Sequence, residues 1–87
     1  MKKSIMIATA SLLAISTQAF AEPSCSPGSA LKPMWQSVQS FENAGGKVIA
    51  VKINEGGCYE VYGTLDNKKF EVFFDPNTGV ELERIAA

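Results

Sequence analysis

The 87-residue chain contains no histidine. Histidine is the commonest general base, the usual activator of serine and cysteine nucleophiles, and the usual nitrogen ligand of zinc. Its absence removes the most frequent ingredients of hydrolase active sites and metal centres. We therefore expect a protein that is not an enzyme and that binds no cofactor or metal.

Basic residues are few, with eight Lys and Arg against nine Asp and Glu. Two of the eight, Lys2 and Lys3, lie in a segment that we expect to be removed, which leaves a net charge of −3. Nucleic-acid affinity comes chiefly from Lys and Arg that neutralise phosphates, and anionic membranes attract the same residues. The composition argues against both kinds of partner.

The N-terminus is typical of an export signal. Lys2 and Lys3 precede an apolar stretch at 5–15, and Ala19-Phe20-Ala21 provides the small-x-small pattern of a cleavage site. The stretch is too short for a membrane anchor, and no cysteine stands at the cleavage site to carry a lipid. We predict a cleaved signal peptide at 1–21 and an exported protein, periplasmic or secreted, that has no membrane association after cleavage.

Cysteine is also scarce, since the chain has only Cys25 and Cys58. Two cysteines cannot complete a four-ligand zinc site, and they lack the C-x-x-C spacing typical of redox centres. A small exported domain is marginal on core burial alone, and an oxidising compartment favours disulfides. We predict one structural Cys25–Cys58 disulfide, worth roughly 3–4 kcal/mol in the chain-entropy model.

Hydrophobic periodicity predicts one helix and four strands. An irregular lead-in at 22–32 precedes a helix from Pro33 that ends at Gly45-Gly46, and apolar residues recur along it at Met34, Trp35, Val38 and Phe41. Alternating segments at 47–54, 58–64, 69–75 and 80–85 predict strands, separated by turns at 55–57, 65–68 and 75–79.

These elements predict an α+β fold, in which one N-terminal helix packs on a three- to four-stranded antiparallel sheet within a single domain at 33–87. The predicted core combines the apolar side of the helix with one face of the sheet: Trp35, Val38, Phe41, Ile49, Val51, Ile53, Tyr59, Val61, Phe70, Val72 and Phe74.

Two aromatic residues fall on the opposite face of the predicted sheet. If Phe70, Val72 and Phe74 face the helix, Phe73 faces away, and the same parity places Tyr62 with it. An exposed pair of Tyr62 and Phe73 is a possible partner-binding patch, since aromatic residues are enriched at interfaces. The alternative is a cross-strand pair that only stabilises the sheet.

Other candidate sites are weak. Glu60 and Glu71 could lie on neighbouring strands, but such carboxylates more often belong to a solvated face than to an acid–base dyad. The segment from Asp75 to Gly79 has a calcium-loop spacing, yet Val80 stands where glycine is needed and Ala86 where a bidentate glutamate is needed.

The order of short motifs resembles that of the PepSY domain family. The matching residues are Gly46, then Gly57, Tyr59, Glu60 and Val61, then Val72, Asp75, Pro76, Thr78 and Gly79. The resemblance covers most of 33–82, and the two cysteines are similar to those of small exported members. It implies a non-enzymatic binding module, with a proposed role in peptidase inhibition.

That resemblance leaves the partner open. PepSY modules occur in propeptides of secreted metallopeptidases, but these 87 residues contain no peptidase domain for a propeptide to inhibit. We expect an unidentified periplasmic or secreted protein as partner, possibly a peptidase, bound through the sheet face or an edge strand. The alternative is an accessory protein of an envelope redox or metal-handling system.

Overall fold

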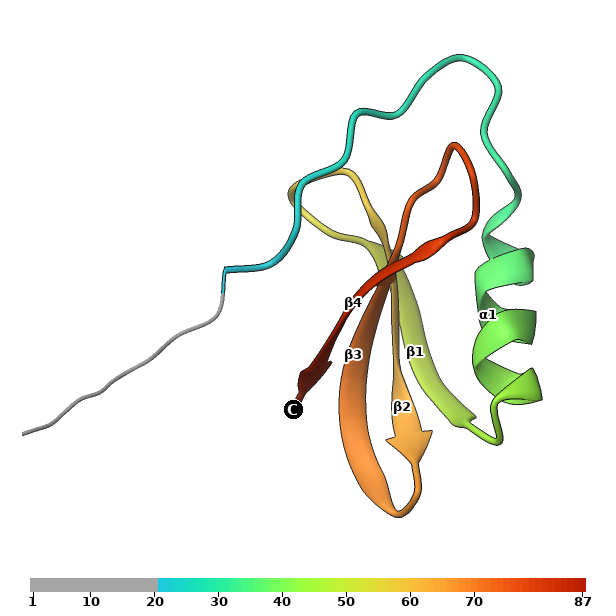
Figure 1. Ribbon diagram of the computed structural model, residues 1–87, viewed down its shortest axis with the longest axis vertical. Helices are drawn as coiled ribbons and strands as arrows, with labels where there is room; N and C mark the ends of the chain where they lie inside the picture. Colours follow the sequence, from blue (N-terminus) through green and yellow to red (C-terminus); the bar gives the residue numbers. More distant parts are fainter. Residues whose placement is uncertain (1–20) are drawn as a thin grey trace, which may run out of the picture.

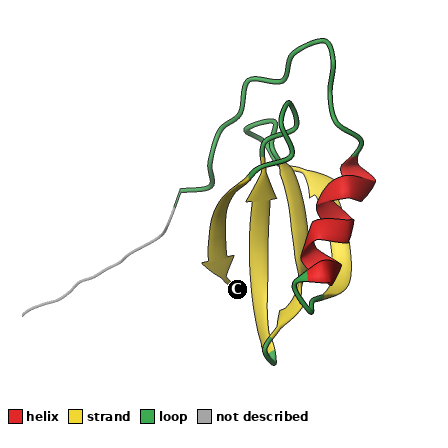
Figure 2. Ribbon diagram, turned by 45° about the vertical axis from the view of Figure 1, so that its right-hand side comes forward, coloured by secondary structure: helices red, strands yellow, loops and turns green. Residues whose placement is uncertain are grey.

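The computed structural model describes residues 21–87 of the chain. Within them a single helix precedes four strands, and the helix lies beside the sheet (Figures 1 and 2). The elements are α1 (Met34–Asn43), β1 (Lys47–Ile53), β2 (Tyr59–Leu65), β3 (Lys68–Phe74) and β4 (Glu81–Ala86). The segment before α1 contains neither helix nor strand and arches over one end of the sheet (Figure 1).

The four strands form one antiparallel sheet in the order β1-β2-β3-β4. Each strand therefore pairs with its neighbour in sequence, and β1 and β4 are the two edges. The β2–β3 hairpin turns at Asp66 and Asn67, whose φ angles of 51° and 64° suit a two-residue turn that follows the twist of the strands. The predicted α+β class, the antiparallel pairing and this hairpin are confirmed.

Glycines end α1 as predicted. The N–H of Gly45 donates to the carbonyl of Glu42 at 2.9 Å, and the N–H of Gly46 donates to the carbonyl of Phe41 at 3.0 Å. Gly45 has a φ of 94°, a conformation that glycine adopts without a Cβ penalty. This Schellman arrangement satisfies two carbonyls of the last turn and directs the chain into β1.

The main core lies between α1 and one face of the sheet, which we call the helix face. Residues of β2 and β3 that alternate onto this face pack against Phe41 of the helix, which is 2% exposed. The buried cluster consists of Phe41, Tyr59, Val61, Leu65, Val72 and Phe74, with Met34, Val38, Val48 and Phe70 partly buried against it. Leu65, which the sequence placed in a turn, is the buried last residue of β2.

The ring of Phe41 requires two glycines beside it. A Cβ added at Gly46 or Gly63 would meet the Phe41 ring, and at Gly63 it would also meet the carbonyl oxygen of Lys47. Gly63 lies on the helix face of β2, between Val61 and Leu65. Close approach of the helix to the sheet therefore depends on the missing side chain at Gly63.

The prediction that Trp35 belongs to the core is wrong, because its side chain is 60% exposed. The inward side of α1 carries Met34, Ser37, Val38 and Phe41, which are spaced by three or four residues. Trp35 is about 100° around the helix from Met34 and lies outside this stripe. Ser37, which is 1% exposed, occupies an inward position that hydropathy could not reveal.

The predicted burial of Ile49, Val51 and Ile53 is also wrong, since all three are exposed. The register of β1 on β2 shifts between Val48 and Ala50, so Ile49 is an extra residue at a bulge. The bulge breaks the alternation that placed Ile49 with the other two. Val51 and Ile53 oppose Val61 and Tyr59 on the helix face, but they lie on the edge strand and are incompletely covered.

Among the described residues, no helix is long and apolar enough to span a membrane.

Candidate functional site

The sheet face turned away from the helix, which we call the open face, is organised in cross-strand rows. Lys52, Glu60, Phe73 and Glu83 form one row across the four strands. The next row contains Ala50, Tyr62, Glu71 and Ile85. The open face thus combines carboxylates with aromatic and apolar side chains, and it contains both residues that the sequence singled out for partner binding.

A disulfide attaches the lead-in to this face. Cys25 and Cys58 are bonded, with their Cα atoms 5.1 Å apart, which confirms the predicted pairing. Cys58 precedes β2 by one residue and shares the parity of Glu60, so it lies on the open-face side. The N–H of Cys25 also donates to the carbonyl of Gly56 at 2.7 Å. The lead-in is therefore held against the β1–β2 turn.

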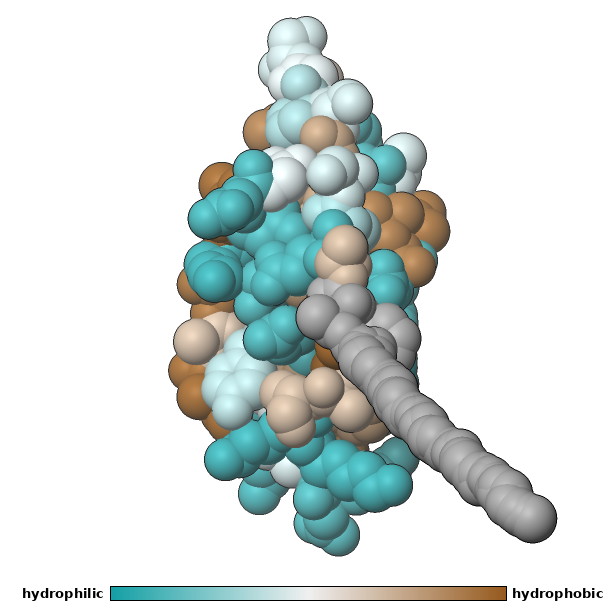
Figure 3. Space-filling view, turned by 90° about the vertical axis from the view of Figure 1, so that its left-hand side faces the viewer, coloured by the Kyte–Doolittle hydropathy of each residue, from teal (hydrophilic) through white to brown (hydrophobic). Residues whose placement is uncertain are grey.

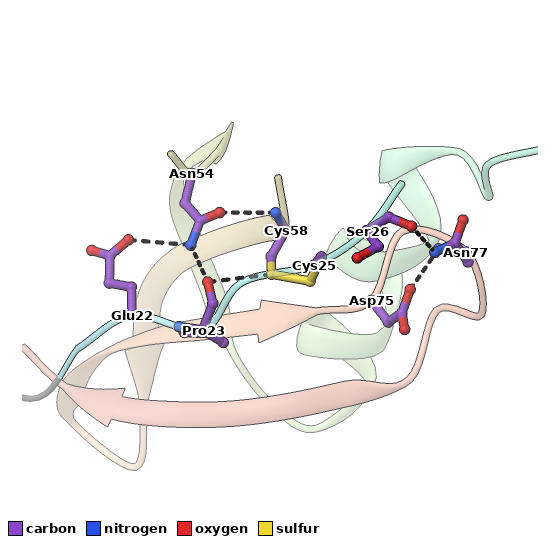
Figure 4. The surroundings of a disulfide bond; sticks show 8 residues. All are labelled: Glu22, Pro23, Cys25, Ser26, Asn54, Cys58, Asp75 and Asn77. Atoms are coloured by element: carbon purple, nitrogen blue, oxygen red, sulfur yellow. Dashed lines mark hydrogen bonds between the residues drawn. A yellow bond between two sulfur atoms is a disulfide. The ribbon is translucent and has the colours of Figure 1, made fainter. Parts of the chain in front are cut away.

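Asn54 joins this turn to the lead-in (Figure 4). Its side-chain amide donates to the carbonyl of Pro23 at 3.1 Å and to the carboxylate of Glu22 at 3.3 Å. Its side-chain oxygen accepts the N–H of Cys58 at 2.8 Å. Asn54 is 5% exposed, so these bonds satisfy a buried polar group and orient Glu22 near the open face.

A second asparagine holds the lead-in at the β3–β4 turn. Asn77 donates from its side chain to the carbonyl of Ser26 at 2.9 Å and accepts the N–H of Gly28 at 2.7 Å. Its own N–H donates to the carboxylate of Asp75 at 2.8 Å, which shapes the turn (Figure 4). The segment from Asp75 to Gly79, which has a weak calcium-loop spacing, thus forms hydrogen bonds to the lead-in.

Phe73 faces away from the helix, as parity required, but the prediction that it is exposed is wrong. It is 0% exposed, among the most buried side chains of the described residues. Tyr62, in the neighbouring row, is half-buried. Sequence parity could assign the face but could not show that the lead-in is attached to it. Tyr62 and Phe73 are not a matching exposed pair.

Glu60 is the unusual polar group of the open face. Its side chain is 5% exposed, and its Oε1 atom has no hydrogen-bond partner within the described residues. The closest cation is Nζ of Lys52, 3.9 Å from Oε1. Burial raises the pKa of the Glu60 carboxyl; Lys52 opposes this effect, whereas Glu22 and Glu71 reinforce it. Burial and like charge thus both disfavour the ionised form.

An open groove of about 340 Å³ spans β1, β2 and β3 beside Glu60. It is bordered by Ala50, Lys52, Glu60, Tyr62, Glu71 and Ala87, with Val51 at the strand edge. A second, larger hollow of about 540 Å³ lies between the lead-in and the β1–β2 turn, bordered by Glu22 and Lys52 among others. Lys52 separates the two hollows.

The two edge strands have different surfaces. On β1 the exposed side chains of Ile49, Val51 and Ile53 are 54%, 41% and 60% accessible. On β4 the guanidinium of Arg84 pairs with Glu81 at 3.0 Å and lies over the ring of Phe70. Charge protects an edge from pairing with another chain. The β1 edge is the better candidate for strand addition.

The hydrophilic end of the molecule lies elsewhere. Figure 3 shows hydrophilic residues at the lower end, where Asp66, Asn67 and Lys68 form the exposed β2–β3 turn, and a second hydrophilic group across the middle of the view. Hydrophobic side chains appear mainly along the two margins of that view. The apolar candidate surface is thus separate from the charged tip.

Sequence reasoning dismissed Glu60 and overlooked Asn54 and Asn77. A carboxylate in an alternating strand carries no local sign of burial, because burial depends on tertiary contacts. Asn54 did carry a signal, since it directly precedes a Glu-Gly-Gly turn, and turn asparagines commonly bond to nearby backbone. Within residues 21–87 no group of three or more potential metal-ligating side chains occurs.

Comparison with known proteins identifies one family. The model of the peptidase propeptide and YPEB domain, PepSY_2, matches residues 5–84, a span that begins inside the predicted signal peptide. No curated protein and no solved structure matches the chain. The matched span covers nearly the whole sequence, including most of the four-stranded sheet and the β3–β4 turn that contains Asn77. The chain therefore belongs to the PepSY family of peptidase propeptide and YPEB domains.

Proposed function

We propose that this protein is a small exported binding module that catalyses no reaction and that inhibits or modulates a peptidase by docking on it. Membership of a family described by peptidase propeptides supports a peptidase as the target. The export signal at 1–21 lies outside the described residues, apart from its last residue, and stays a prediction. The Cys25–Cys58 disulfide supports export, because such bonds persist in oxidising compartments.

The apolar β1 edge is the observation that carries the proposal. An edge strand presents unpaired backbone groups, and an extended peptide can add to them as a further strand. Ile49 and Ile53 are more than half exposed beside this edge, and Lys47 and Lys52 are the two charged residues of β1. We propose that the occupant is an extended, β-forming segment of the peptidase.

The open-face pair predicted from the sequence, Tyr62 and Phe73, has a smaller role in the proposed docking. Tyr62 borders the groove that opens beside β1, so it can contact an added strand. Phe73 is fully buried and offers no surface to a partner. We therefore assign partner contact to β1 and Tyr62, and we assign Phe73 a role in packing.

The test measures whether the protein inhibits purified exported metallopeptidases. The protein is used as it is purified from the cells that express it, with whatever processing they have carried out. A variant with Ile49→Lys and Ile53→Lys places two cations beside the β1 edge. A matched control with Val80→Lys and Leu82→Lys changes two exposed apolar residues, 58% and 44% accessible, just before and within β4 at the other edge. We expect the first variant to inhibit at least about tenfold more weakly, because charged edges resist strand addition.

Two results would count against this function. Equal inhibition by both variants would show that β1 is not the docking edge. Failure of the unmodified protein to slow any of the peptidases, even in molar excess, would contradict the inhibitory role. Circular dichroism of each variant checks that the sheet is intact.

A further inference from the structure

Glu60 is buried without the partner that a buried carboxylate requires. Its side chain is 5% exposed, whereas that of Lys52 is 65% exposed. The distance of 3.9 Å between Lys52 Nζ and Glu60 Oε1 exceeds the 2.7–2.9 Å typical of a charge-assisted hydrogen bond. Lys52 is thus a loose and solvated neighbour, and Oε1 accepts no hydrogen bond within the described residues.

The surroundings of Glu60 have an excess of negative charge. Glu22 approaches from the lead-in and Glu71 from β3, while Lys52 on β1 is the single opposing cation among the groups that act on Glu60. Three carboxylates against one ammonium group favour an additional cation. A recess with low-dielectric walls strengthens this preference.

The groove beside Glu60 suits a long side chain with a charged end. On β1 it is bordered by Ala50, whose small side chain opposes Tyr62 across the strand pair. Val51 and Ala87 contribute apolar surface, and Glu60 and Glu71 contribute the carboxylates. An apolar passage that leads to carboxylates matches the stem and the guanidinium of an arginine.

We propose that this groove receives an arginine side chain from the strand that docks on β1. The guanidinium lies against Glu60 and Glu71, and its stem crosses Ala50 beside Tyr62. This inference rests on the proposed edge docking and names the chemistry that the docked segment requires. The planar guanidinium can satisfy a carboxylate with two parallel hydrogen bonds, which an ammonium group cannot do.

The test compares two blocked peptides, Thr-Val-Arg-Val-Thr and the same sequence with citrulline in place of arginine. Citrulline keeps the shape of arginine but has no charge. Binding to the purified protein is followed by amide and side-chain NMR shifts. We expect the arginine peptide to bind about tenfold more tightly, the factor typical of a charge-assisted pair in a recess.

Three variants test which residues favour arginine over citrulline. Glu60→Gln should abolish the preference for arginine, whereas Glu55→Gln, which changes an exposed carboxylate in the β1–β2 turn, should leave it unchanged. Ala50→Leu should weaken binding of the arginine peptide by obstructing the groove. Shifts induced by the arginine peptide should include the Glu60 carboxyl carbon and the ring of Tyr62.

The outcomes separate this inference from the proposed function. Equal affinity for the two peptides, no detectable binding of either, or a preference that survives Glu60→Gln would overturn the arginine groove. Edge docking would then be judged by the peptidase assay alone. A preference for arginine without peptidase inhibition would support the groove and contradict the inhibitory role. Calcium chloride that displaces the arginine peptide by binding at Glu60 would mean that the groove is a metal site.

Discussion

The helix face and the open face of the same sheet are covered by different means. On the helix face, α1 packs apolar side chains against β2 and β3, and the cover follows from amphipathic periodicity. On the open face, an irregular segment is attached through the Cys25–Cys58 disulfide and the side chains of Asn54 and Asn77. A domain of this size needs such attachment, because one apolar layer leaves much of its surface unburied.

The two faces also differ in the charged groups that they bury. The helix face buries an aliphatic and aromatic cluster, with no carboxylate in it. The open face buries Phe73 and, beside it, the carboxylate of Glu60. Among the described residues the one buried carboxylate thus lies on the face with the irregular cover, beside the groove. We expect both faces to contribute to stability, and the open face together with the β1 edge to govern binding.

The largest expected effects come from aromatic truncation on each face. Phe41→Ala and Phe73→Ala should each lower the free energy of unfolding by about 3–5 kcal/mol, since both side chains are almost fully buried. Urea unfolding monitored by far-UV circular dichroism measures the change. A cost at Phe73 well below that at Phe41 would mean that the lead-in does not complete a second core.

Removal of the disulfide should have a similar or slightly smaller effect. The double change Cys25→Ala with Cys58→Ala should cost roughly 3–4 kcal/mol, because the bond closes a loop across 33 positions. Thermal unfolding with and without reductant provides the measurement. If reductant leaves the melting temperature of the unmodified protein unchanged, the bond does not contribute to holding the lead-in.

The close contact between α1 and β2 gives a smaller effect, confined to the helix face. Gly63→Ala should cost about 1–3 kcal/mol, since the new methyl group meets Phe41 and the carbonyl of Lys47. Gly45→Ala is a useful comparison, because it strains the backbone but meets no atom within 4 Å. Loss of stability at Gly63 with retention of peptide binding would support the division between the faces.

Glu60, which lies on the open face, should make the free energy of unfolding depend on pH. Burial raises its pKa above the ordinary value of 4.5, so the folded state holds this proton more tightly than the unfolded state. The stabilisation is complete below pH 4.5 and is lost as pH rises through the folded-state pKa. Glu60→Gln should therefore raise the melting temperature at pH 7 and change it little near pH 4.

A pH series of thermal unfolding curves measures this difference, with Glu42→Gln on the exposed side of α1 as the control. The charged groups that face Glu60 are Lys52 on β1, which lowers its pKa, and Glu22 on the lead-in and Glu71 on β3, which raise it. A melting temperature for Glu60→Gln that lies below that of the unmodified protein at neutral pH would show that the Lys52 ion pair outweighs the cost of burial.

The smallest expected effect is that of Trp35. Because its side chain is 60% exposed, Trp35→Ala should change the free energy of unfolding by no more than about 0.5 kcal/mol. The urea midpoint of this variant provides the check. A loss comparable to that of Phe41→Ala would mean that the helix-face core extends around α1.

Local features of the sequence accounted for most of the elements. Gly45 and the Asp66-Asn67 pair occupy positions with positive φ, and such requirements are visible in the sequence because few residues meet them. Alternation located all four strands to within one or two residues. The candidate site was harder to predict from the sequence. Nothing in the residues around Phe73 and Glu60 distinguishes these two from ordinary strand residues.

The sequence by itself determined the order and type of the elements, the facing of Phe73 and the pairing of its two cysteines, since periodicity, turn geometry and a single possible pair leave little choice. Only the tertiary structure decided that Trp35 and Ile49 are exposed, that Phe73 and Glu60 are buried, and that a groove opens at Ala50. The exposure of Trp35 follows from which side of α1 meets the sheet, and that of Ile49 from a bulge in β1. The open face also depends on contacts between the lead-in and turns about 30 to 50 residues away along the chain, which no local pattern encodes.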